Sequence, residues 1–132
     1  MNTDSSDQKT GVLLEKELTE KILGAAFKVH NTLGCGFLER VYENALVLEL
    51  KRSGLTVKQQ RAVQVKYDGA VVGEYVVDLL VAGRVVVECK AVSGIDPVHE
   101  AQLLNYLRAI PAHVGLLLNF GRPRLQHRRL VL

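Results

Sequence analysis

Residues 85–91, with the sequence VVVECKA, constrain the fold of this chain more than any other segment. Three consecutive β-branched residues predict a strand that is buried on both faces of a sheet. The same strand ends with Glu88 and Lys90, and charges in such a place are costly unless they are paired or bind a metal ion. The rest of the chain therefore has to supply a partner for these charges or a site that uses them.

The first part of the chain has the spacing of helices. Apolar residues recur at helical intervals over residues 14–33, which predicts a long amphipathic helix that ends at Gly34. A second pattern of this kind covers residues 38–50 and predicts a helix that stops near Gly54. The short segment GCGF separates the two predicted helices.

The periodicity changes after the second predicted helix. Residues 55–91 are rich in valine and are interrupted at Asp68-Gly69 and at Ala82-Gly83. An Asp-Gly pair between two alternating apolar segments is a hairpin signal. This region therefore predicts three successive strands, the last of which is RVVVECK.

The last third of the chain predicts one more helix and two strands. Asp96-Pro97 offers an N-cap and a proline at the first helical position, for a helix that runs to about Ala109. HVGLLLNF predicts another buried strand, and RLQHRRLVL predicts an edge strand with basic residues facing outward. The predicted order is helix, helix, three strands, helix, strand, strand.

Length and composition indicate one globular domain. The 132 residues suit a single core, with residues 1–10 as a flexible polar tail and residues 11–132 as the domain. The chain has no apolar run long enough to span a bilayer, and its N-terminal segment lacks an apolar signal core, so a cytoplasmic protein without a membrane partner is expected. The two cysteines indicate neither a zinc site nor a disulfide framework. A net charge of +3 is a weak indication of an anionic partner.

Alternation along the strands brings acidic and basic residues together. Glu88 and Lys90 share one face of their strand, whereas Cys89 points to the other face and is expected to be a small buried apolar residue. Asp78 lies in the preceding apolar strand, EYVVDLLVA, which we expect to pair with the strand of Glu88. Two carboxylates beside a lysine suit Mg²⁺ or Mn²⁺. The alternative is a buried salt bridge between Lys90 and one of the two acids.

Two helices carry further candidates. His99, Gln102 and Tyr106 lie along one stripe of the helix that follows the charged strand. In GFLERVY, Glu39 and Tyr42 share a face of the second helix. On periodicity alone Tyr42 is expected in the core, and Glu39 is expected to be a solvated first-turn acid that the helix dipole favours.

Three motifs in this order resemble a known family. GFLERVY resembles the G-x-x-E-x-x-Y signature of the small bacterial and archaeal GxxExxY proteins, and QLLNY resembles a Q-x-x-x-Y motif. Asp78, followed after nine residues by ECK, resembles the D…(D/E)-x-K pattern of the PD-(D/E)XK nuclease superfamily. The resemblance extends from about Leu18 to Val131. It implies a single α/β domain (α+β mixed) with an αβββαβ core, in which helices flank a mixed sheet.

The resemblance also implies roles for the candidate residues. Asp78 and Glu88 would bind the metal ion, and Lys90 would orient the attacking water and stabilise charge on the phosphate. Glu39 would join the site directly or through a water, and Gln102 would lie near the attacking water or the substrate.

The remaining candidates concern contact with the substrate. Tyr106 is expected to support the site or contact the substrate. His99 could contact a phosphate, although a surface histidine near a helix start is an equal alternative. A basic path for a nucleic-acid backbone could be formed by Arg122, Arg124, Arg128, Arg129, Lys58, Arg61 and Lys66. The alternative is a solvated edge strand whose charges deter aggregation.

The sequence therefore predicts a divalent-metal-dependent nuclease-like domain that acts on DNA or RNA. One alternative is a catalytically silent module with the same fold that binds nucleic acid or another protein. Another is a metal-dependent hydrolase of small phosphodiesters. Because the domain is small for a nuclease, we expect a homodimer or a protein partner to supply specificity.

Overall fold

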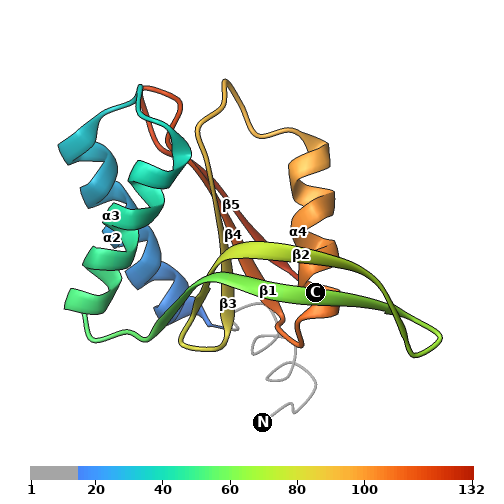
Figure 1. Cartoon of the computed structure of the whole chain (residues 1–132). Coiled ribbons are helices and arrows are strands. Elements are labelled where there is room, and N and C mark those ends of the chain that lie inside the picture. The colour runs from blue at the N-terminus through green and yellow to red at the C-terminus, as the bar shows by residue number, and fades with distance from the viewer. Residues whose placement is uncertain (1–14) are drawn as a thin grey trace, which may run out of the picture.

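The computed structural model describes residues 15–132 (Figure 1). The predicted tail over residues 1–10 and the predicted helix start at Leu14 lie outside these residues. The elements follow the predicted order and are α2 (Lys16–Leu33), α3 (Glu39–Arg52), β1 (Val57–Tyr67), β2 (Ala70–Val81), β3 (Val85–Lys90), α4 (Pro97–Ala109), β4 (Val114–Asn119) and β5 (Gln126–Val131).

The five strands form one mixed sheet in the order β1-β2-β3-β4-β5. β3 and β4 are parallel and are connected through α4, whereas the other neighbouring pairs are antiparallel. Helices α2 and α3 cover one face of the sheet, and α4 covers the other (Figure 1). This arrangement confirms the predicted single α/β domain with a mixed sheet flanked by helices, and it confirms β5 as an edge strand.

Both predicted turns between the first three strands are present. Asp68 and Gly69 have φ values of 49° and 80°, and they form a two-residue loop between β1 and β2. Positive φ at both positions matches the twist of an antiparallel hairpin. Ala82 and Gly83, with φ values of 53° and 68°, make the turn from β2 to β3. None of the helices within residues 15–132 is long and apolar enough to cross a membrane.

The sheet separates two apolar cores. Val85, Val87 and Cys89 of β3 belong to the core under α2 and α3, whereas Val86 belongs to the core under α4. Because side chains alternate along a strand, Glu88 projects from the α4 side of the sheet. Cys89 is fully buried, which confirms its prediction as a small buried residue, and burial is the main cause that raises the pKa of its thiol.

The long β1–β2 hairpin changes faces in its middle. Val77 and Leu79 would share a face in a regular strand, yet Val77 packs with Val63 in the core under α4 and Leu79 packs in the core under α2 and α3. The alternation therefore slips once, at Asp78. Across the ladder, Gln60 has a φ of 54°, an unusual value for a residue with a side chain. The slip occurs in both strands together, so the pairing keeps the same register on either side of it, and the register shifts only farther along, between Val65 and Lys66.

Candidate functional site

Strands β2 and β3 separate at the two acidic residues. Residues 79–81 of β2 pair with residues 85–87 of β3, and the pairing goes no further. β3 nevertheless continues to Lys90 along β4. Asp78 and Glu88 are therefore the first residues beyond the paired segment, and we call this position the fork.

At the fork, each of the two acids accepts a hydrogen bond from the backbone of the other strand. The backbone N–H of Asp78 donates to Glu88 Oε2 at 2.7 Å, and the backbone N–H of Cys89 donates to Asp78 Oδ2 at 2.8 Å. These contacts replace the ladder hydrogen bonds that end at the fork. They commit one oxygen of each carboxylate, and the two carboxyl groups also lie close enough to share a hydrogen bond.

The fork favours neutral carboxyl groups when no cation is bound. Burial, followed by repulsion from Asp78, raises the pKa of Glu88 from 4.5 to about 8. Burial is also the first cause that raises the pKa of Asp78. A divalent cation would compete with the proton that the raised pKa of Glu88 favours.

Lys90 contributes charge to the fork without a direct ion pair. Its positive charge lowers the pKa of both Asp78 and Glu88. No ion pair of Lys90 with either acid forms within residues 15–132, where the salt bridges join other residues. The alternative interpretation, a buried salt bridge as the reason for these charges, is therefore not supported.

Glu39 approaches the fork from α3. It is the first residue of that helix, and its Oε1 accepts the backbone N–H of Ala91 at 3.4 Å, just beyond the end of β3. The charges of Glu39, Asp78 and Glu88 all raise the pKa of the buried Cys89 thiol, after burial itself. The structure thus places the predicted helix acid on the same strand end as the two strand acids.

Tyr42 anchors the loop that positions Glu39. Its ring is fully buried and stacks on Phe120, with 4.7 Å between the ring centroids. Its hydroxyl donates to the carbonyl of Gly34 at 2.6 Å and accepts the backbone N–H of Phe37 at 3.2 Å. These contacts confirm the expectation that Tyr42 belongs to the core.

Sequence analysis missed a buried acid, Glu43, and its link to Asp78. Glu43 is 2% exposed, and its two carboxylate oxygens accept the side-chain amide of Gln60 at 3.1 and 3.0 Å. The same amide lies 3.5 Å from Asp78 Oδ1, and the charge of Glu43 helps to raise the pKa of Asp78. The available signal was the spacing of Glu39 and Glu43, which are four residues apart on α3 and so share a face.

The loop after Lys90 is fixed by a second residue that the sequence did not single out. The side chain of Asn119, fully buried at the end of β4, accepts the N–H of Val92 and donates to its carbonyl, both at 3.0 Å. Gly121 lies against the same backbone, and a Cβ there would be 2.5 Å from Val92. The sequence signal for this role was a polar residue at the end of an apolar strand. A buried side-chain amide needs hydrogen-bond partners, so such a residue is expected to bind nearby backbone.

The three candidates on α4 separate in the structure. His99 completes a capping box with Asp96, because its Nδ1 accepts the Asp96 N–H at 3.1 Å while Asp96 accepts the His99 N–H. Tyr106 lies near the fork, since the charges of Glu88 and Asp78 add to the burial that raises the pKa of its hydroxyl. Gln102 lines a neighbouring groove, and within the described chain it forms no hydrogen bond to either acid. A phosphate contact of His99 and a role of Gln102 near the water stay predictions.

The basic residues fall into two separate sets. Arg61 and Lys66 lie on β1, whereas Arg128 lies on β5, at the opposite edge of the sheet. Arg128 is also paired with Glu100 at 3.8 Å. The predicted single basic path is thus divided by the three strands between β1 and β5.

The donor set at the fork fits a hard divalent cation. Asp78 and Glu88 offer carboxylate oxygens that are partly shielded from water, and this burial is the first cause of the raised pKa of each group. Residues 15–132 contain no group of three or more His, Cys, Asp or Glu side chains placed to hold a metal ion. A pair of carboxylates fits the usual coordination of Mg²⁺ in proteins, in which one or two carboxylates bind the ion and several waters remain bound.

Comparisons with known proteins agree on the fold. The family profile described as "PD-(D/E)XK nuclease superfamily" matches residues 16–130. Among solved structures, the crystal structure of SSO0001 is similar, with 20% sequence identity and a TM-score of 0.56. The match covers 91% of this chain and 60% of SSO0001, so the chain spans about 60% of the length of that protein. No curated protein matches the chain.

Proposed function

Because this chain belongs to the PD-(D/E)XK nuclease superfamily, we propose that it hydrolyses phosphodiester bonds in DNA or RNA with a divalent metal ion. Asp78 and Glu88 would hold the ion, which is Mg²⁺ or Mn²⁺. The observation that carries the proposal is the fork, where two partly buried carboxyl groups are fixed against each other with no cationic side chain paired to them within residues 15–132. Such a pair is unfavourable for folding, and residues that are unfavourable for folding are expected at functional sites.

We also propose that the chain belongs to the GxxExxY group within the superfamily. The support comes from two residues of GFLERVY: Tyr42 hydrogen-bonds to the loop between α2 and α3, and Glu39 contacts the backbone just beyond the end of β3. Glu39 would then orient a water or complete the ligand set through one.

The side chains around the fork have distinct tasks in this proposal. Mg²⁺ or Mn²⁺, when bound, would polarise the phosphate and lower the pKa of a bound water. Lys90 supplies a fixed positive charge where negative charge develops on the phosphate, and it is available because no acid pairs with it within the described residues. Gln60 and Glu43 hold Asp78 in place from the other side.

A second candidate function is a catalytically silent nuclease-fold module that binds nucleic acid or a protein. The observation that favours it is the lack of a third metal-ligating side chain at the fork within residues 15–132. In either case we expect a second copy or a protein partner to add specificity, because the domain is small.

The decisive experiment is a cleavage panel. Single- and double-stranded DNA and RNA are incubated with the protein and Mg²⁺ or Mn²⁺, and Asp78→Asn serves as the matched variant. Metal-dependent cleavage that Asp78→Asn abolishes supports the nuclease. Calorimetric binding of Mg²⁺ to the parent but not to the variant, without cleavage of any substrate, favours the silent module.

A further inference from the structure

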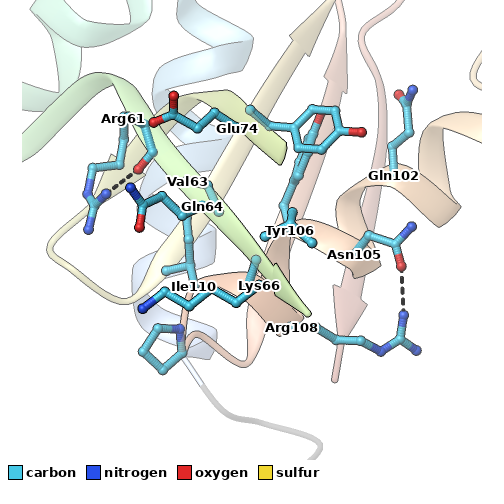
Figure 2. A pocket seen from close by; sticks show the side chains of 15 residues that line it. Arg61, Val63, Gln64, Lys66, Glu74, Gln102, Asn105, Tyr106, Arg108 and Ile110 are labelled. Atoms are coloured by element: carbon cyan, nitrogen blue, oxygen red, sulfur yellow. Dashed lines mark hydrogen bonds between the residues drawn. The ribbon is translucent and has the colours of Figure 1, made fainter. Parts of the chain in front are cut away.

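A groove runs beside the fork between the hairpin and α4. Figure 2 shows its walls, with side chains of β1 on one side and side chains of α4 on the other. Its volume is about 990 Å³. Arg61 lines one end of the groove and is the direct neighbour of Gln60, whose side chain contacts Asp78. The groove therefore includes the residue of β1 that directly follows the one in contact with Asp78.

The groove carries an excess of positive charge. Arg61, Lys66 and Arg108 line it, and Glu74 is the acid in its wall. None of these three cations has an ion-pair partner among residues 15–132. Arg61 donates to the carbonyl of Ala62, and Arg108 donates to the side chain of its neighbour on α4, so both guanidinium groups keep their charge available for an anion.

Two tyrosines that contact each other line the same groove. The rings of Tyr75 on β2 and Tyr106 on α4 lie 5.8 Å apart, tilted by 52°. Tyr75 is 53% exposed, so much of its ring is open to solvent and to a ligand. Exposed aromatic rings in a basic groove are the pattern by which proteins bind single-stranded nucleic acid, because each unpaired base offers a face for stacking.

We propose that this groove binds a single-stranded segment of nucleic acid and presents it to the fork. Bases stack on Tyr75 and Tyr106, and phosphates lie beside Arg61, Lys66 and Arg108. This inference rests on the proposed function for the identity of the polymer, and it adds the form in which the polymer is bound.

The size of the groove favours a single strand over a duplex as the occupant that fills it. A volume of about 990 Å³ is at the upper end of the range for small-molecule pockets, so it holds a few nucleotides of one strand. In a duplex the bases stack on one another and expose only their edges in the grooves, so they offer no face to a tyrosine. Tyr106 also connects the groove to the fork, since the charges of Glu88 and Asp78 reach its hydroxyl.

The test measures binding in EDTA, so that it does not depend on cleavage. Fluorescence anisotropy is recorded with labelled single strands of about ten nucleotides, as DNA and as RNA, and with the matching duplexes. We expect the parent to bind one or both single strands more tightly than the duplexes. Tyr75→Ala should weaken single-strand binding by about 5- to 150-fold, which corresponds to the loss of one stacked base.

Matched variants separate stacking and charge from general damage. Tyr75→Phe and Tyr106→Phe keep the rings and should bind as the parent does. Tyr67→Ala removes a tyrosine of the same hairpin that is 69% exposed but lies outside the groove, and it should have no effect. Arg61→Gln should reduce the slope of log K against log salt by about 0.7, whereas Lys51→Gln on α3 should leave it unchanged.

The outcomes distinguish this inference from the proposed function. Duplex binding as tight as single-strand binding, or Tyr75→Ala binding like the parent, overturns the inference even if the protein cleaves nucleic acid. Tight single-strand binding that is lost in Tyr75→Ala supports the inference even if no cleavage is found with any metal. Because Tyr75 is exposed, its loss does not threaten the fold, and a melting curve confirms this.

Discussion

The carboxylate of Glu88 accepts the backbone N–H of Asp78 at 2.7 Å, so one acid of the fork fixes the position of the other. The contact ties two residues that are ten positions apart and lie on strands that have stopped pairing. It also affects the two acids differently: burial and then the charge of Asp78 raise the pKa of Glu88, whereas burial and the charge of Glu43 raise the pKa of Asp78, which its hydrogen bond with Glu88 lowers.

The first prediction concerns pH and stability. Folding raises the pKa of Glu88 from 4.5 to about 8, so between these values the folded state binds more protons than the unfolded state. The free energy of unfolding of the metal-free protein should therefore fall as pH rises from about 5 to about 8, by an amount on the order of a few kcal/mol. The raised pKa of Asp78 acts in the same direction.

Urea titrations in EDTA at several pH values measure this dependence. Glu88→Gln should show a shallower decline, because it removes the group with the raised pKa. Saturating Mg²⁺ should restore stability at the upper end of the range, where it competes with fewer protons. A decline of equal slope in the parent and in Glu88→Gln would assign the effect to other groups.

The second prediction compares two substitutions of Asp78. Asparagine keeps an oxygen that can accept the Cys89 N–H, and it removes a charge from the fork. Asp78→Asn should therefore be as stable as the parent at neutral pH, or more stable, and should lose Mg²⁺ binding. Asp78→Ala leaves the Cys89 N–H without its acceptor and should cost about 1–3 kcal/mol.

Thermal melts with and without Mg²⁺ test this pair of variants. If Asp78→Asn unfolds the protein, Asp78 is a structural residue and the metal site loses its main support.

The third prediction concerns Lys90. If its ammonium acts on the phosphate, Lys90→Ala should slow cleavage by about 10²-fold or more. Its Mg²⁺ affinity should be unchanged or slightly higher, because a positive charge close to the cation is removed. The melting temperature should change little, since no ion pair involves Lys90 within residues 15–132. Cleavage rate, calorimetric affinity and a melting curve on one purified variant give all three values.

A strong loss of stability in Lys90→Ala would argue against this role. It would mean that the lysine neutralises a buried carboxylate, a change that costs several kcal/mol when the partner is removed. Lys51→Ala, at an exposed position on α3, is the control for loss of a positive charge.

The fourth prediction concerns Gln60, whose backbone has a φ of 54°. Both Gln60→Gly and Gln60→Ala lose the contacts of the amide, which costs about 1 kcal/mol. Glycine adopts this conformation without strain and offsets the loss, so Gln60→Gly should fold as well as the parent. Alanine keeps the strain that glutamine already has, so Gln60→Ala should lose about 1 kcal/mol. Both variants remove the amide that links Glu43 to Asp78. Mg²⁺ affinity should fall by about 10-fold or more in both, as for other residues that orient a ligand.

Calorimetry and denaturation on the two variants separate the effects. Equal Mg²⁺ affinity in Gln60→Gly and the parent would show that the link does not position Asp78.

Local patterns in the sequence were enough to predict the order and type of the elements. Helical spacing ends at Gly34, which caps α2, and Asp96 begins α4 with a capping box. The Asp68-Gly69 pair makes the hairpin loop, and alternation in VVVECK put Glu88 and Cys89 on opposite faces. These features depend on residues that are neighbours along the chain, and so a single sequence contains them.

The tertiary structure decided how the candidate site is assembled. The fork exists because β3 continues along β4 after it has left β2, and no local pattern states where two strands stop pairing. Glu43 and Gln60 meet across 17 positions, and Asn119 reaches Val92 across 27. Contacts at such separations depend on strand register and on helix docking, which result from burial of the whole apolar core. The sequence therefore determined which residues are candidates for the chemistry, and the packing of α3 and the hairpin determined which of them meet.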